Sequence, residues 1–338
     1  MGSGTRNILA IVLSMGVLLV WYTFIAPPPK PQTQLQPTAV AQPSASSPAP
    51  VSSPLTTTAK KFREPGKQIL LENEKARIFI DTNGGVVAEW ELKEYKVGLA
   101  EKQGTILATS FFSQQVAMEG PIFFEVARSS KEELVLQAKQ KGQTIVKNFR
   151  LPPNSYQLEM EVEWKNRGTQ TVAFVPSIEW GRQPHEESPQ RGALFFKTPP
   201  DRWHPIYFKD GSLKDFAQDV VPAPQREMGR VGWIGAQSRY FLSGVIPDGR
   251  EGDGIEVGSY TLENGEQYFF EKLFLTSAQV LPNESWSQKF RIYGGPKDLS
   301  QLNQMGSGME QTVGYGWTKL LAIPILHLLQ FFYKIIHN

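Results

Sequence analysis

A strictly alternating segment constrains the fold of this chain more than any other feature of its sequence. In NSYQLEMEVEWKNRG, residues 154–168, every second position is apolar, and these positions are Tyr156, Leu158, Met160, Val162 and Trp164. Polar residues, most of them glutamates, fill the positions between them. Successive side chains of a β-strand point to opposite faces of the sheet, so the pattern predicts a long, half-buried strand.

Similar runs recur through the middle of the chain. KARIFIDTNGGVVAEWEL predicts two strands joined by the turn Asn83-Gly84-Gly85, and SYTLENGEQYFFEKLFL predicts a second hairpin around Asn264-Gly265. Further strand-like runs are ELVLQAK, TIVKNFRL, TVAFVPSIEW, RYFLSGVIP and WSQKFRIYGG. Short strands with regular turn signals indicate a large antiparallel β-sandwich, and the lack of alternating βαβ units argues against a Rossmann-type fold.

The N-terminal sequence predicts a membrane anchor. NILAIVLSMGVLLVWYTFI, residues 7–25, carries no charge, and about 18 such residues can cross a bilayer as a helix. Trp21 and Tyr22 lie near one end, where aromatic rings favour the headgroup layer. A cleaved signal peptide is the alternative, but Phe24 and Pro27 make a poor cleavage site.

Charge and composition predict the orientation of this anchor and the tether that follows it. Arg6 and the α-amino group precede the apolar run and Lys30 is the only nearby charge after it, which favours a cytoplasmic N-terminus. The Pro-, Gln- and Ser-rich stretch lacks the residues that build a core, so it should be an extended linker. We therefore expect an anchor (1–26), a linker (27–61), a β domain (62–296), a short helical connector (297–312) and a terminal amphipathic helix (313–338).

Composition and motifs give little support for catalysis. A net charge of +2 gives no general electrostatic case for nucleic acid, and a chain without cysteine has no disulfide, thiolate metal site or Cys nucleophile. His185 lies beside Glu186 and Glu187, but neighbouring residues of an extended chain point apart and no second histidine follows at helical spacing. No Ser nucleophile motif, P-loop or dinucleotide fingerprint is present. We expect no catalytic, cofactor-binding or metal-binding residues and no cofactor.

Two loop segments resemble ligand sites in composition only. Arg202, Trp203 and His204 could line a sugar-binding cleft, because an indole can stack on a sugar ring; an ordered loop packed on the sandwich is the favoured alternative. PDGREGDGIEVG lacks the spaced carboxylates of a calcium loop and precedes no helix that could bind phosphate. A hairpin loop explains it better.

The C-terminal stretch YGWTKLLAIPILHLLQFFYKIIHN predicts a helix that lies in a membrane interface. On a helical wheel its polar residues fall within a sector of about 80°; they are Lys319, His327, Gln330, Lys334 and His337. Pro324 should kink the helix. A spanning helix would place His327 near mid-bilayer, where polar groups are costly. The narrow polar stripe instead suits an interfacial helix, and a core helix of the β domain is the alternative.

We expect specific depths for the side chains of this terminal helix. Trp317, Phe331 and Phe332 should lie at the acyl boundary, and Lys319 and Lys334 should lie at the headgroups.

The combination of anchor, linker, β domain and terminal helix resembles the bacterial YidC membrane-protein insertase family. The resemblance is most specific at YGW, followed by Pro324, a lysine- and aromatic-rich helix and Asn338. It extends through DTNGGVVAEWELKEY, VGWIGAQSRYFLSGVIP and YGGPKDLSQL. It implies a periplasmic β-supersandwich similar to galactose mutarotases, with the terminal helix on the periplasmic side of the inner membrane.

The resemblance also implies a function and its partners. Members of this family aid the insertion, folding and assembly of integral membrane proteins, with or without the Sec translocon, and need no cofactor or nucleotide. Expected partners are nascent integral membrane proteins, the Sec translocon, SecD and SecF, and membrane lipid. The family's groove-forming transmembrane helices would follow Asn338, so we expect residues 1–338 not to insert proteins alone.

A membrane-anchored, mutarotase-like carbohydrate-binding or epimerase domain is the alternative function. Such an enzyme needs a general acid and a general base on opposite sides of a sugar. His185 and His204 are the histidines of the β domain, and neither lies in a recognisable motif. A sugar enzyme would also have no use for an interfacial helix, so the insertase reading is preferred.

Overall fold

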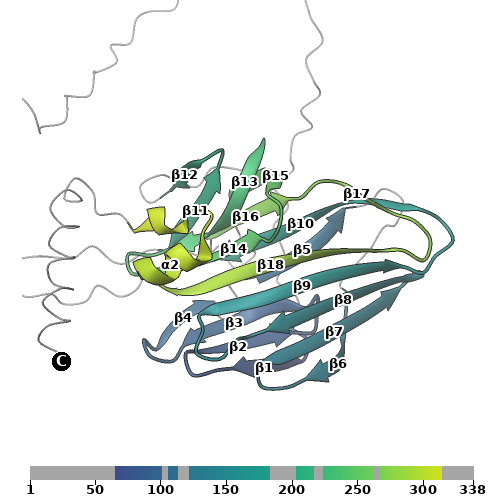
Figure 1. The fold of residues 1–338 in the computed structure, drawn as a ribbon, viewed down its shortest axis with the longest axis horizontal. Coiled ribbons are helices and arrows are strands. Elements are labelled where there is room, and N and C mark those ends of the chain that lie inside the picture. The colour runs from purple at the N-terminus through teal and green to yellow at the C-terminus, as the bar shows by residue number, and fades with distance from the viewer. Residues whose placement is uncertain are drawn as a thin grey trace, which may run out of the picture. The chain divides into compact units, whose positions relative to one another are not determined.

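The computed structural model describes residues 65–100, 106–112, 122–182, 203–216, 224–261 and 267–313 (Figure 1). These ranges hold eighteen strands, one α-helix and one 3₁₀-helix, and every strand pairing is antiparallel. The predicted antiparallel β class is therefore confirmed. Within the described ranges no helix has both the length and the apolarity to span a bilayer. The predicted anchor, linker and terminal helix lie outside them.

The strands form two sheets that share one strand. Sheet I follows the order β1 (Gln68–Glu72), β2 (Ala76–Asp81), β3 (Val86–Leu92), β5 (Ile106–Phe112), β10 (Val172–Arg182), β16 (Gln267–Phe274) and β15 (Gly252–Thr261). Sheet II follows the order β14 (Phe241–Pro247), β18 (Ser285–Pro296), β9 (Gln157–Asn166), β8 (Gln143–Arg150), β7 (Glu133–Gln140) and β6 (Glu125–Ser129). The short strands are β4 (Val97–Ala100) on β3 and β17 (Ala278–Val280) on β10.

The shared strand is β13 (Gln225–Gln237). Its first half pairs with β15 of sheet I and its second half pairs with β14 of sheet II, on the same edge. The other edge carries β11 (His204–Lys209), which forms a hairpin with β12 (Ser212–Asp215). The register shifts between Met228 and Val231, where Gly229 has a φ of 146°. This irregularity lets one strand leave sheet I and enter sheet II.

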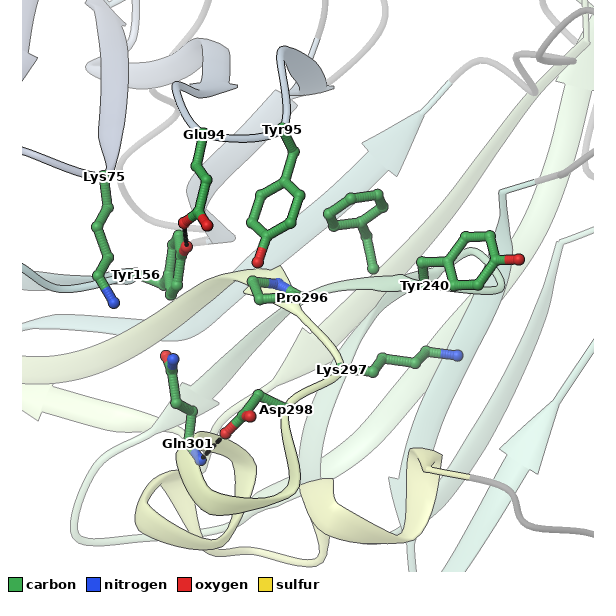
Figure 2. Close-up of a pocket in the computed structure, with 10 residues that line it drawn as sticks. Lys75, Glu94, Tyr95, Tyr156, Tyr240, Pro296, Lys297, Asp298 and Gln301 are labelled. Atoms are coloured by element: carbon green, nitrogen blue, oxygen red, sulfur yellow. Dashed lines mark hydrogen bonds between the residues drawn. The ribbon is translucent and has the colours of Figure 1, made fainter. Parts of the chain in front are cut away.

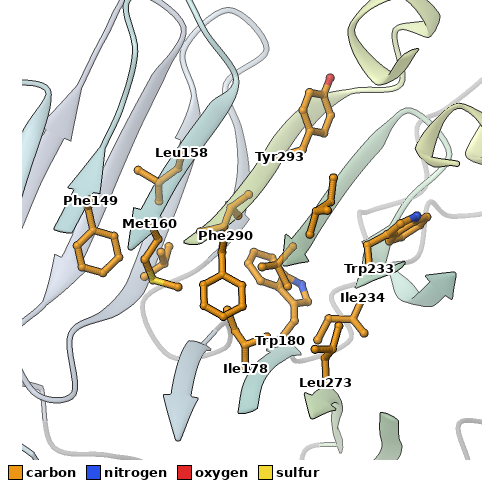
Figure 3. Close-up of a cluster of buried hydrophobic side chains, with 14 of the residues drawn as sticks. Phe149, Leu158, Met160, Ile178, Trp180, Trp233, Ile234, Leu273, Phe290 and Tyr293 are labelled. Carbon is orange, nitrogen blue, oxygen red and sulfur yellow. The ribbon is translucent and has the colours of Figure 1, made fainter. Parts of the chain in front are cut away.

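The two sheets enclose one apolar core. In β9 the predicted alternation is present, because Leu158, Met160, Val162 and Trp164 are buried and the residues between them are half-exposed. Figure 3 shows side chains of β8, β9, β10, β13, β16 and β18 gathered in this core. The Trp164 indole donates to the Gln143 side chain at 2.8 Å, so its buried N–H is satisfied.

The predicted turn between β2 and β3 is stabilised by a buried lysine of the facing sheet. Gly84 and Gly85 have φ values of 84° and 56°, which glycine adopts readily. Lys147 of β8 is 1% exposed, and its Nζ donates to the carbonyl oxygens of Gly84 at 2.6 Å and Gly85 at 2.9 Å. The same ammonium lies 5.2 Å from the centre of the Phe124 ring. The turn and the lysine together join sheet I to sheet II.

After β18 a short helical segment packs back onto the sheets. Helix α2 (Leu299–Met305) is capped by Asp298, and the 3₁₀-helix η1 (Met309–Thr312) follows. The Trp233 indole donates to the Ser307 carbonyl at 3.0 Å, and Arg291 donates to the Met305 carbonyl at 2.8 Å. Leu302 and Met309 are fully buried. These contacts fix the position of the chain up to Val313.

Candidate functional site

The main candidate site is a pocket of about 620 Å³ at one end of the sandwich (Figure 2). Its walls come from turns of sheet I, strand ends of sheet II and helix α2. It is lined by Lys75, Glu94, Tyr95, Tyr156, Tyr240, Phe241, Pro296, Lys297, Asp298 and Gln301. A volume of this size suits a small ligand or part of a larger one.

One buried asparagine positions two of these walls. Asn73 Oδ1 accepts hydrogen bonds from the backbone N–H groups of Lys75 at 2.9 Å and Ala76 at 2.8 Å, which closes the turn between β1 and β2. Its Nδ2 donates to the carbonyls of Pro152 at 2.7 Å and Ser155 at 2.9 Å. Asn73 therefore places Lys75 and the segment leading to Tyr156 relative to each other.

Tyr156 forms the floor of the pocket. Its hydroxyl donates to Glu94 Oε2 at 3.2 Å, and the Lys75 ammonium lies 4.4 Å from the centre of its ring. Burial, together with the neighbouring Tyr95 and Glu94, raises the pKa of the Tyr156 hydroxyl. The hydroxyl is therefore protonated at neutral pH, and it acts as a donor to the carboxylate rather than as a base.

Aromatic rings form the wall opposite Lys75. Tyr95 packs edge-on against Phe241 with 5.3 Å between ring centres, in the T-shaped geometry that aromatic pairs favour. Beneath the pocket the Tyr293 hydroxyl donates to the Pro296 carbonyl at 2.6 Å. Gly295 packs between the two tyrosines, since a Cβ there would lie 2.9 Å from both the Tyr156 ring and the Tyr293 hydroxyl.

Both carboxylates of the pocket have structural partners. Glu94 accepts the Tyr156 hydroxyl, and Asp298 Oδ1 accepts the Gln301 backbone N–H at 2.9 Å as the N-cap of α2. In contrast, no carboxylate pairs with the Lys75 ammonium among the residues that the structure describes. Lys75 therefore supplies a cation at this wall that makes no ion pair with the described residues, while Glu94 and Asp298 keep their negative charges.

The sugar-cleft hypothesis for the loop at Arg202–His204 finds no support in the residues described there. Trp203 is 4% exposed, and the Arg182 guanidinium lies 4.1 Å from the centre of its ring. His204 Nε2 lies 2.9 Å from Asp215 Oδ1 within the β11–β12 hairpin. The indole is thus packed inside the protein and does not present a ring face to a ligand. Arg202 lies outside the described residues.

The other predicted site residues also lie outside the described ranges. These are His185, Glu186 and Glu187, and the interfacial residues Trp317, Lys319, Pro324, Phe331, Phe332 and Lys334. Within the described part of the chain no group of three or more His, Asp or Glu side chains could hold a metal ion.

Sequence reasoning did not find the pocket. Its residues come from segments that are far apart in the chain, and only folding brings Lys75, Tyr156 and Gln301 together. One signal was available, because Tyr95 and Tyr240 are aromatic residues within short polar turns. Large apolar rings in turns are unusual enough to suggest a surface site.

The chain matches the family model described as the YidC periplasmic domain over residues 68–328. It is 26% identical to a protein named membrane protein insertase YidC from Geobacter metallireducens, over 98% of this chain and 65% of that protein. A protein of the same name from Methylobacillus flagellatus is 24% identical, over 98% of this chain and 64% of its own length. The chain thus spans slightly less than two thirds of the relatives that it matches.

Two solved structures show a similar arrangement of strands. A putative aldose 1-epimerase from Escherichia coli K12 has a TM-score of 0.48 at 11% identity, covering 68% of this chain and 98% of its own. A galactose mutarotase related enzyme from Lactobacillus acidophilus has a TM-score of 0.45 at 10% identity, covering 68% and 97%. Neither likeness assigns an activity to this chain.

Proposed function

The chain belongs to the YidC family, and on this premise we propose that it serves the insertion, folding and assembly of integral membrane proteins in the bacterial inner membrane. The match to the YidC periplasmic domain over residues 68–328 carries the proposal. Relatives that bear the name membrane protein insertase YidC align with nearly the whole chain and support it.

The proposal places the β domain in the periplasm. The uncharged apolar run at residues 7–25 anchors the chain with its N-terminus in the cytoplasm, and the Pro-rich stretch tethers the domain. The terminal helix over residues 313–338 lies in the periplasmic membrane interface, with Lys319 and Lys334 at the headgroups. The domain boundaries given above are part of this proposal.

The β domain acts in this process without catalysis or a cofactor. Both carboxylates of the described pocket have structural roles, Glu94 as the acceptor of the Tyr156 hydroxyl and Asp298 as the N-cap of α2. Insertion is instead a solvation problem, because polar flanks of a client must find water or polar groups while its apolar segment meets lipid. The proposed partners are nascent integral membrane proteins, the Sec translocon, and SecD and SecF.

Photo-crosslinking tests the proposed partners. Met228 and Leu281 are 65% and 51% exposed, so a photoreactive benzoylphenylalanine at either position leaves the core intact. We expect irradiation of cells that carry Met228→p-benzoylphenylalanine or Leu281→p-benzoylphenylalanine to join the chain to translocon components or newly made inner-membrane proteins. Recovery of soluble periplasmic proteins alone would contradict the proposal.

A further inference from the structure

The pocket contains a lysine whose ammonium makes no ion pair with the described residues. The Lys75 ammonium faces the Tyr156 ring, and Figure 2 shows its side chain and that of Gln301 extending toward one another from different walls. Glu94 and Asp298 are engaged in the hydrogen bonds described above. A lysine beside an amide donor suits a compact anionic group such as a phosphodiester.

Aromatic rings at the rim are exposed in a way that favours an amphipathic ligand. Tyr95 is 42% exposed and Tyr240 is 62% exposed, although both are large apolar residues. Figure 2 shows Tyr240 and Lys297 extending side by side, away from the pocket floor. Tyrosine combines an apolar ring with a polar hydroxyl, and this combination is typical of side chains at the headgroup level of a bilayer.

The pocket lies at the end of the β domain from which the chain continues toward residue 314. Gln301 of α2 lines the pocket, and the described chain then runs on through η1 to Val313 (Figure 1). Because the chain leaves the β domain at this end, residues that follow in the membrane interface would bring the pocket rim to the membrane surface. This step rests on the proposed function, which places residues 313–338 there.

We propose that this pocket binds phospholipid headgroups of the inner membrane and holds the β domain against the bilayer. The phosphodiester lies at Lys75 and Gln301. The rings of Tyr95 and Tyr240 lie at the depth of the glycerol and ester groups, with Lys297 at the phosphates. The contact orients the domain at the membrane surface, beside the site where client segments enter.

A peptide fits this pocket less well than a lipid. Capture of an extended peptide by strand addition requires an unpaired strand edge. The strands that reach the pocket are β14, which pairs with β13 and β18, and β18, which pairs with β14 and β9. Their edges are therefore occupied by neighbouring strands. The remaining walls are turns and a helix, which offer side chains rather than a backbone ladder.

Lipid photo-crosslinking in native inner membranes tests this inference. The full chain carries p-benzoylphenylalanine at Tyr240 or, as a control, at Phe123. Phe123 is 60% exposed and forms a β-bridge with Asn83, which follows the end of β2 away from the pocket. At the usual rise per residue, the length of β2 separates it from the pocket by about 20 Å. Mass spectrometry of the irradiated chain then identifies phospholipid adducts at each position.

We expect phospholipid adducts at position 240 and few at position 123. Lys75→Gln should reduce the adduct yield at position 240 about five-fold, because one cation near an anionic membrane surface contributes about 1 kcal/mol. Lys75→Arg keeps the positive charge and should restore the yield. Lys139→Gln removes an exposed charge next to the β7–β8 turn, at the other end of sheet II, and should leave the yield unchanged.

Equal lipid yields at positions 240 and 123, or a yield that Lys75→Gln does not lower, would overturn the inference. Adducts of position 240 with protein alone would assign the pocket to a peptide and overturn it as well. The outcome is separable from the proposed function. If lipid adducts form but membrane-protein insertion does not depend on the chain, the lipid site stands and the proposed function is rejected. If insertion depends on the chain but no lipid adducts form at position 240, the lipid site alone is rejected.

Discussion

The backbone N–H of Gly235 donates a hydrogen bond of 2.6 Å to the carboxyl group of Glu271, across the place where the two sheets divide. Gly235 belongs to the part of β13 that pairs with sheet II, and Glu271 belongs to β16 of sheet I. The glutamate is 1% exposed. A buried carboxyl group thus satisfies a backbone donor at the junction of the sheets.

This arrangement makes folding stability depend on pH. Burial raises the pKa of Glu271 well above its ordinary value of 4.5, and the backbone hydrogen bonds oppose this only in part. Because the pKa of Glu271 is higher in the folded state than in the unfolded state, its stabilising contribution is complete at pH values below the unfolded-state pKa. This contribution is lost as the pH rises from the unfolded-state pKa to the folded-state pKa. Within that window the loss is about 1.4 kcal/mol per pH unit.

We therefore expect Glu271→Gln to flatten the decrease in unfolding free energy that begins as the pH rises above about 4.5. Denaturant titration of both proteins at several pH values measures this. Glu256→Gln, at a half-exposed position of the neighbouring strand β15, is the matched carboxyl-to-amide control. Parallel curves for Glu271→Gln and the original chain would contradict the assignment.

The close approach at Gly235 predicts a severe effect of a single methyl group. A Cβ at this position would lie 2.1 Å from the backbone oxygen of Ser243, which cannot rotate away. Gly235→Ala should destabilise the domain by about 3 kcal/mol. A Cβ at Gly211 would meet no atom within 4 Å. Gly211→Ala should therefore lose only the free energy needed to hold alanine at a φ of 78°, about 1 kcal/mol. Equal losses in denaturant unfolding would refute the steric argument.

Lys147 should contribute to stability although it is a buried cation. Lys147→Met keeps an unbranched side chain, one atom shorter, but leaves the carbonyls of Gly84 and Gly85 without this donor. We expect a loss of about 2 kcal/mol by thermal or denaturant unfolding. Lys139→Met, at an exposed position of the adjacent strand, should change stability by no more than about 0.5 kcal/mol. A neutral Lys147→Met would show that the turn does not need the lysine.

Replacing Asn73 should lower both the free energy of unfolding and lipid binding at the pocket. Asn73→Ala removes the hydrogen bonds to Lys75, Ala76, Pro152 and Ser155, and a loss of about 3 kcal/mol follows from their usual net values. The same variant should lower the lipid adduct yield at position 240 under conditions where the chain is still folded. An unchanged yield would show that the turn at Lys75 is held by other contacts.

The parts of the fold that sequence predicted are those with a clear period. In β9 one face is buried and the other is not, so alternation is visible. In β13 the residues from Val231 to Gln237 are all buried while the first half is largely exposed, and neither half alternates cleanly. A strand that changes sheets has no single solvent face, so periodicity could not identify it.

The pocket escaped prediction for a different reason. Its polar residues act through neighbours that lie far away in the sequence, such as Glu94 with Tyr156, 62 residues apart. Tyr156 is buried, as the alternation predicts, although it directly precedes β9, and burial alone does not indicate a ligand site. Nothing in the spacing of the single segments could show that Lys75 has no carboxylate partner in the described fold.

The most direct measurement of the central claim is membrane-protein insertion in cells depleted of this chain. Newly made inner-membrane proteins are pulse-labelled, and their insertion is followed by protease accessibility from the periplasmic side, with a re-expressed chain as control. The account predicts that depletion reduces insertion of at least a subset of clients, while export of soluble periplasmic proteins continues at first. Because residues 1–338 are not expected to insert proteins alone, their re-expression should restore insertion only where the groove-forming helices of the family are also present. Unchanged insertion of all clients after full depletion would contradict the account.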